Sequence, residues 1–282
     1  MGIGNAFRAA VRLIYRRLLP RSAKNSLRAW TLFDVPDSPP QVIESFGEAR
    51  VMVLAPHMDD EVVGCGGTIR RHVLAGARVT VVFLTDGRSS DPNIAKDCHG
   101  ETEIRAAQAA LCERRKLEAG AAARILGYDE LIFLDRPDGN LKTDDALIRE
   151  VADLIAVHDP QVIYYPCVLE LHPDHWEASR LLAKVVDAGS PPTLANTLCR
   201  AYEAWTPLLP NRLVDISDVF DIKIEALKVF VSQLEHVDYL RTTTGLNAYR
   251  AATRDGQGYW EAFFESTAAQ HAELVRQLDT AR

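Results

Sequence analysis

Two short motifs rich in histidine and aspartate hold residue types that could bind a metal ion. The first is Pro56–Glu61 (Pro-His-Met-Asp-Asp-Glu) and the second is His172–His175 (His-Pro-Asp-His). In each motif two candidate ligands are three residues apart, so both side chains can converge at a helix start or a tight turn. Two histidines and one carboxylate, with a position left for water, form a ligand set of catalytic zinc. Because such an ion activates water and polarises a carbonyl, the motifs favour metal-assisted hydrolysis of an amide or ester.

The side chains of these motifs divide into candidate ligands and candidate acid–base groups. The first motif offers His57 and Asp60 as ligands, and either His172 or His175 could complete the set. Asp59 and the remaining histidine are the types that hydrolysis needs, as a base for the water and as a donor for the oxyanion or leaving nitrogen. A lone His-x-x-Asp is more often a helix cap, but two such motifs at strand ends favour a metal site.

Each motif follows an apolar run that is typical of a buried strand. Val51–Ala55 ends at the first motif, and Val162–Pro166 ends a few residues before the second. Similar runs at Val79–Leu84 and Leu131–Leu134 alternate with helical stretches, which predicts an α/β fold with a mostly parallel sheet, a Rossmann-like three-layer sandwich. Ligands bind outside the carboxyl ends of strands in such sheets, so both motifs are expected at one edge.

The C-terminal third adds further elements to this domain, which we assign to residues 46–282. Leu198–Trp205 and Arg212–Ile216 are candidate strands, and Val219–Glu235 has the pattern of one long helix. Scattered aromatic residues in this third could stack on sugar faces but are more often core residues.

Composition narrows the class of protein. A net charge of −7 argues against a nucleic-acid binder. Five widely spaced cysteines without a Cys-x-x-Cys pair fit neither a disulfide framework nor a zinc ribbon, so we expect a cytoplasmic protein. The glycines of Gly64–Ile69 lack the spacing of a phosphate or dinucleotide loop, which favours a packing role for them.

Residues 1–45 are expected to form a basic N-terminal extension and linker. Residues 1–28 carry lysines and arginines but no acidic residue, with apolar residues at helical spacing. This amphipathic pattern allows peripheral contact with an anionic membrane face or a partner. The alternative is a helix whose apolar stripe packs on the main domain. The sequence does not indicate an oligomeric state.

In these motifs the chain resembles the PIG-L/LmbE-like family of zinc-dependent N-acetylglucosaminyl deacetylases. Five elements match in the order of the family: Val53–Ile69, Leu84–Gly87, Arg114–Glu118 with Leu126-Gly127 after it, Leu134–Gly139 and His172–His175. The match departs at Met58, where the family usually has proline. That change removes rigidity from the loop but no ligand.

The resemblance implies a role for each matched position. It implies that His57, Asp60 and His175 hold Zn²⁺, although such a set also suits Fe²⁺. It further implies that Asp59 is the general base, that His172 stabilises the oxyanion or protonates the amine, and that Asp174 orients a histidine. Arg115 and Glu118 match an Arg-x-x-Glu segment, where sugar contacts or support of the site are expected.

The resemblance therefore predicts an enzyme that removes the acetyl group from an N-acetyl amino sugar in a GlcNAc-type glycoconjugate or precursor. One alternative is an amidase acting on another amide, such as a thiol conjugate. Another is a non-catalytic sugar-binding or scaffold protein. The residues alone indicate only metal-assisted hydrolysis.

Overall fold

The computed structural model describes residues 39–128, 130–189 and 191–279; the basic segment 1–28 lies outside these described residues. The strands are β1 (Gln41–Val42), β2 (Arg50–Ala55), β3 (Arg78–Thr85), β4 (Glu130–Arg136), β5 (Val162–Pro166), β6 (Leu198–Tyr202), β7 (Arg212–Asp215) and β8 (Trp260–Thr267). The α-helices are α3 (Asp60–Leu74), α4 (Ile94–Asp97), α5 (Glu101–Leu126), α6 (Asp145–His158), α7 (Pro173–Asp187), α8 (Phe220–Lys228), α9 (Val231–Leu234), α10 (Tyr239–Arg250) and α11 (Ala268–Asp279). Short 3-10 helices occupy Pro192–Asn196 and Ala251–Thr253.

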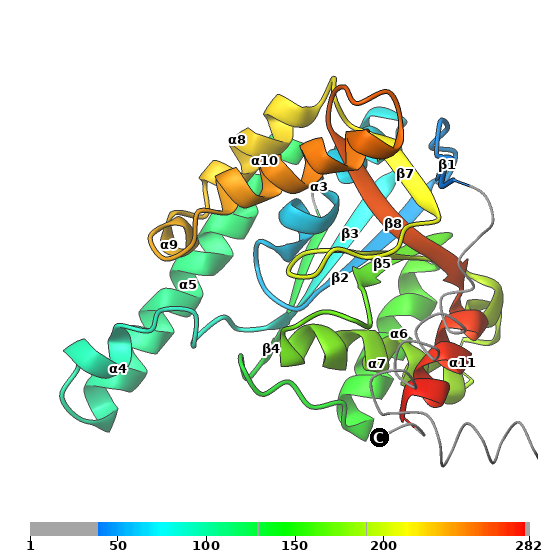
Figure 1. Cartoon of the computed structure of the whole chain (residues 1–282). Coiled ribbons are helices and arrows are strands. Elements are labelled where there is room, and N and C mark those ends of the chain that lie inside the picture. The colour runs from blue at the N-terminus through cyan, green and yellow to red at the C-terminus, as the bar shows by residue number, and fades with distance from the viewer. Residues whose placement is uncertain (1–38, 129, 190, 280–282) are drawn as a thin grey trace, which may run out of the picture. The chain divides into compact units, whose positions relative to one another are not determined.

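The described strands form one sheet in the order β1-β7-β8-β6-β5-β2-β3-β4 (Figure 1). All neighbouring pairs are parallel except those of β8, which runs antiparallel to both β6 and β7. This confirms the mostly parallel α/β sheet that the apolar runs predict. The sequence pattern did not predict strand β8.

Helices cover both faces of the sheet, with α6, α7 and α11 on one side and α3, α5, α8 and α10 on the other (Figure 1). The side chains of β2 show why. Met52 and Leu54 belong to the core cluster that includes α6 and α7, whereas Val51 and Val53 belong to the one that includes α3 and α5. A strand buried on both faces must be apolar at every position, which is the pattern seen in the sequence.

The two strands that carry the motifs are neighbours in the sheet. Residues 51–53 of β2 pair in parallel with residues 162–164 of β5. From this pair the sheet extends through β3 on one side and through β6 on the other. The carboxyl ends of β2 and β5 therefore form a switch point, where the loops that follow the strands separate and leave room for a ligand.

Helix α3 begins at the first motif and is kinked at Cys65, whose φ and ψ are −147° and 22°. Two of its glycines allow close contacts: a Cβ at Gly64 would lie 2.3 Å from the ring of Tyr202, and one at Gly67 would lie 2.6 Å from Ile216. The packing role predicted for these glycines is thus confirmed. After the kink, the carboxylate of Glu261 in β8 accepts hydrogen bonds from the amides of Gly67 and Thr68 at 2.9 and 2.8 Å.

The expected long helix over Val219–Glu235 is wrong, because the chain breaks between α8 and α9. The cause is a distant carboxylate: Glu118 of α5 accepts hydrogen bonds from both the amide and the hydroxyl of Ser232, at 2.9 and 2.6 Å. Phe230, at the break, is fully buried in the core. Among the described residues, no helix is both long and apolar enough to span a membrane.

Candidate active site

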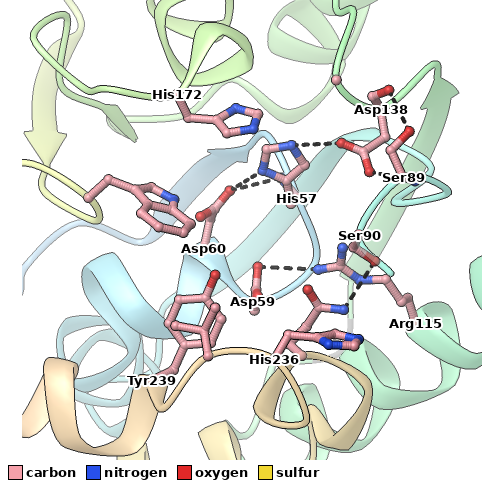
Figure 2. A pocket seen from close by; sticks show the side chains of 14 residues that line it. His57, Asp59, Asp60, Ser89, Ser90, Arg115, Asp138, His172, His236 and Tyr239 are labelled. Atoms are coloured by element: carbon pink, nitrogen blue, oxygen red, sulfur yellow. Dashed lines mark hydrogen bonds and ion pairs between the residues drawn. The ribbon is translucent and has the colours of Figure 1, made fainter. Parts of the chain in front are cut away.

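A cavity of about 380 Å³ opens at the carboxyl ends of β2 and β5 (Figure 2). Its walls come from six parts of the chain: the first motif, the loop after β3, α5, the loop after β4, the start of the second motif, and the stretch from β6 to α10. The lining residues are His57, Asp59, Asp60, Ser89, Ser90, Arg115, Asp138, Gly139, His172, Trp205, Gln233, His236, Val237 and Tyr239. Both sequence motifs therefore meet in one cavity.

The first motif holds Asp59 in a backbone conformation that is rare outside glycine, with φ at 145°. Three groups brace it. The carbonyl of Asp59 accepts the amides of Val62 and Val63 at the start of α3. The carboxylate of Glu61 accepts the Asp59 amide at 3.0 Å, and Tyr128 donates to the other Glu61 oxygen at 3.3 Å. Strain of this kind persists only where the surroundings fix it, and it is common at functional sites.

Arg115 of α5 supports the same loop from inside the protein. Its guanidinium donates to the carbonyl of Met58 at 2.5 Å and lies 3.3 Å from the Asp59 carboxylate. Burial raises the pKa of Asp59 to about 7, although the positive charge of Arg115 acts in the opposite direction. Glu118, one helical turn further on, is engaged with Ser232 and does not line the cavity.

His57 is surrounded by carboxylates. Its Nδ1 lies 3.1 Å from Asp60 Oδ2, and its Nε2 lies 3.1 Å from Asp138 Oδ1 (Figure 2). The same Nε2 lies 3.3 Å from Asp174 Oδ2. Burial alone would lower the pKa of His57, but these three carboxylates raise it well above its ordinary value. Asp138 had no predicted role, and the signal that could have revealed it is its place in the Leu134–Gly139 match to the family.

The second motif forms the first turn of α7. The imidazole of His172 caps this helix, accepting the Asp174 amide at 3.2 Å, and Pro173 follows at the first helical turn. The carboxylate of Asp174 accepts the amides of Gly139 and Leu141 at 2.8 and 3.0 Å, which ties the motif to the loop after β4. His175 is completely buried, and its ring centroid lies 5.4 Å from that of His172.

These side chains fit a metal ion. Atoms of His57, His172 and His175 that could be ligands lie within 4.8 Å of one another, and so do those of His57, Asp138 and Asp174. Asp60 Oδ2 lies 3.1 Å from His57 Nδ1 and 3.2 Å from His175 Nε2. Two ligand atoms on one tetrahedral zinc ion are separated by about 3.3 Å, given bonds of about 2.0–2.1 Å.

The hydrogen bonding of His175 points the same way. Although its ring is fully buried, neither nitrogen has a hydrogen-bond partner among the described residues. Buried polar atoms are nearly always satisfied, so an unpaired imidazole facing a carboxylate suggests a ligand position. Burial would raise the pKa of Asp60, but His175 and His57 beside it hold that pKa well below its usual range.

The wall opposite the candidate metal cluster comes from residues outside the two motifs, and of these Ser90 and Gln233 had no predicted role. Gln233 donates to the hydroxyl of Ser90 at 3.1 Å, and His236 lies 3.4 Å from Asp91, so the α9 segment contacts the loop after β3. Trp205 and Tyr239 add an aromatic pair in edge contact, with ring centroids 6.0 Å apart. No local pattern marks Gln233, which reaches the cavity only because the chain breaks between α8 and α9, whereas Trp205 comes from the loop after β6.

Comparison with known proteins places this cavity in a family. Residues 52–186 match the profile of PIG-L, GlcNAc-PI de-N-acetylase. The chain is also 30% identical to the diacetylchitobiose deacetylase of Thermococcus kodakarensis over 206 residues, which cover 68% of this chain and 73% of that protein. The chain belongs to the PIG-L family. A probable N-acetyl-alpha-D-glucosaminyl L-malate deacetylase 2 of Bacillus cereus is likewise 30% identical, over 67% of this chain and 85% of that protein.

A solved PIG-L fold agrees with the architecture. The N,N'-diacetylchitobiose deacetylase of Pyrococcus horikoshii, crystallised with an inhibitor, superposes with a TM-score of 0.66 and 21% identity. The superposition covers 89% of this chain and 94% of the other. It therefore extends well beyond the PIG-L profile match, into the C-terminal strands and helices that complete the sheet.

Proposed function

We propose that this chain is a metal-dependent deacetylase that hydrolyses the acetamido group of an N-acetyl amino sugar of the GlcNAc type. The observation that carries the proposal is the meeting of Asp59 and His172 with the candidate ligands in one cavity. A site that only held a metal ion would not need the Asp59 carboxylate and the His172 imidazole to face the same cavity. The family relatives, which are named as deacetylases of acetylated sugars, support the same reaction.

His57, Asp60 and His175 are the proposed ligands, and the proposed ion is Zn²⁺, with Fe²⁺ as an alternative for the same donor set. When bound, the ion supplies Lewis acidity, which lowers the pKa of a water and polarises the substrate carbonyl. Asp138 and Asp174 contact the Nε2 side of His57 and hold that ring in place, so its Nδ1 remains available beside Asp60.

Asp59 is the proposed general base, which takes a proton from the attacking water at its carboxylate. Arg115 positions this carboxylate by holding both the Met58 carbonyl and the acid itself. His172 is the proposed donor to the developing oxyanion or the departing amine. It is only partly buried, and its Nδ1 is fixed by the Asp174 amide, so its Nε2 is the nitrogen that remains for substrate.

Sugar binding is assigned to the opposite wall. Ser89, Ser90 and Gln233 offer hydroxyl and amide groups for sugar hydroxyls, whereas Trp205 and Tyr239 offer ring faces and edges for the pyranose. Arg115 and Glu118 act in this proposal mainly as support, because Arg115 is bound to the loop of the first motif and Glu118 holds the start of α9.

The test is acetate release from a panel of N-acetylglucosamine conjugates by the metal-loaded protein, with a chelated sample beside it. Asp59→Ala should abolish turnover while metal and sugar binding remain. Asp153→Ala, which removes an exposed carboxylate of α6, is the matched control and should keep full activity. Equal activity of Asp59→Ala and the wild type would refute the assigned base. Metal binding without acetate release from any conjugate would instead favour another amide substrate or a binding protein.

A further inference from the structure

Glu170 is a buried carboxylate that stands between the candidate metal cluster and the aromatic rim of the cavity. It lies in the loop between β5 and α7 and is 2% exposed. Its Oε1 accepts the amide of Ala204 at 2.7 Å, and its Oε2 accepts the amide of Trp205 at 2.8 Å. Because β5 and β6 are parallel neighbours, the loops that follow them leave the sheet together, and Glu170 joins one loop to the other.

The same Oε2 atom faces His175. It lies 3.8 Å from Nδ1 of that ring, which is too long for a hydrogen bond but close enough for a small side-chain rotation to form one. The Nδ1 atom is buried and has no hydrogen-bond partner in the part of the chain that the structure describes. Its other nitrogen, Nε2, points at Asp60. A ring that offers a lone pair at Nε2 must carry its proton on Nδ1, where Glu170 is the facing acceptor.

We propose that Glu170 is a positioning residue that couples the ligand role of His175 to the placement of Trp205 at the substrate rim. The carboxylate fixes the Nδ1-protonated tautomer of His175 and, through the same oxygen, the backbone of Trp205. Trp205 is 45% exposed and meets Tyr239 edge to face, so its backbone position determines where the sugar or its aglycone can stack. This inference rests on the proposed function for its substrate and for the ligand role of His175.

Three substitutions separate the coupling from a merely structural role. Glu170→Gln removes the negative charge while nearly keeping the volume. Glu203→Gln is the matched control, since Glu203 is equally buried and braces the same loop through Leu208 and Arg250 rather than through His175. Trp205→Ala removes the ring alone. Thermal unfolding of each variant shows whether it is folded before the other measurements are compared.

The first measurement is zinc affinity by competition with a chromophoric chelator. Glu170→Gln should bind zinc roughly 10- to 100-fold more weakly than the wild type, which is the usual effect of losing a carboxylate behind a histidine ligand. Glu203→Gln and Trp205→Ala should remain close to the wild type. In steady-state assays Trp205→Ala should raise KM alone, whereas Glu170→Gln should raise KM and lower kcat. Equal zinc affinities of Glu170→Gln and Glu203→Gln would overturn the proposal.

The second measurement needs no stable variant of Glu170. Nitrogen-15 spectra of histidine-labelled, zinc-loaded wild-type protein report the tautomer of each ring, and His175 is expected as the Nδ1-protonated form with a slowly exchanging proton. An Nε2-protonated His175 would overturn the proposal even if every variant failed to fold. If the zinc and tautomer results hold but no acetate is released, the proposed reaction fails and the role of Glu170 stands.

Discussion

His271 should make the folded protein sensitive to acid, and the structure allows the size of the effect to be worked out. The ring is 1% exposed in α11. Its Nε2 donates to the carbonyl of Ser179 at 2.8 Å, and its Nδ1 lies 3.0 Å from the hydroxyl of Tyr165, which can donate to it. This arrangement suits the neutral ring, and burial lowers the pKa of His271 from 6.5 to about 4.

The sign follows from proton linkage. Because the folded-state pKa lies below the unfolded value, the unfolded chain binds the proton first as the pH falls. The contribution of His271 to stability is therefore complete above about pH 6.5 and is lost progressively down to about pH 4. The full loss is about 3 kcal/mol at 1.36 kcal/mol per pKa unit, and about 2 kcal/mol of it falls between pH 7 and pH 5.

The assay is urea unfolding of metal-free protein at pH 7 and pH 5, for the wild type and His271→Gln. Glutamine can keep both hydrogen bonds without titrating, so the wild type should lose about 2 kcal/mol more than the variant between the two pH values. The same substitution at His99, which is exposed, serves as the control and should not change the pH dependence. Equal losses in the wild type and His271→Gln would refute the reasoning.

Three further predictions test the packing behind the site. Gly64→Ala should lower the free energy of unfolding by about 1–3 kcal/mol in urea titrations, because its Cβ would overlap the ring of Tyr202. Gly120→Ala in α5 should instead raise the free energy of unfolding by about 0.5–1 kcal/mol, because a Cβ there meets only the end of an arginine at 3.8 Å. A lower free energy of unfolding would contradict the helix assignment. Lys223→Met should lower the free energy of unfolding by about 3–5 kcal/mol in the same titrations, because it leaves the carboxylate of Glu261 buried without its 2.7 Å ion pair. An unchanged urea midpoint would show that the ion pair is not formed.

The sequence was sufficient to predict those structural features whose cause lies in nearby residues. β2 and β5 were predicted as strands because burial on both faces requires apolar residues at every position. His57 and His172 were identified because each lies three residues from a second candidate ligand within its own short motif. The adjacency of the two strands then followed from the general behaviour of parallel sheets rather than from any pairing signal in the residues.

The sequence did not predict those structural features that depend on contacts between residues far apart along the chain. The break before α9 depends on Glu118, which precedes Ser232 by 114 residues. Asp138 reaches His57 only because β4 and β2 flank the same strand, β3. The wall opposite the candidate metal cluster is assembled by such long-range contacts, so its residue types carry no local pattern. Substrate preference is therefore the part of the function that is hardest to derive from sequence.

The carboxylate of Glu261 also affects the order in which the protein can mature during synthesis. It holds the amides that follow the kink of α3, yet it is encoded about 190 residues after them. A nascent chain that has already exposed both histidine motifs from the ribosome still lacks β8, and the helix behind the first motif has open amides until that strand arrives. Metal capture by the growing chain should therefore be weak until the last strand is inserted, and truncations before Trp260 should yield protein that cannot retain the ion.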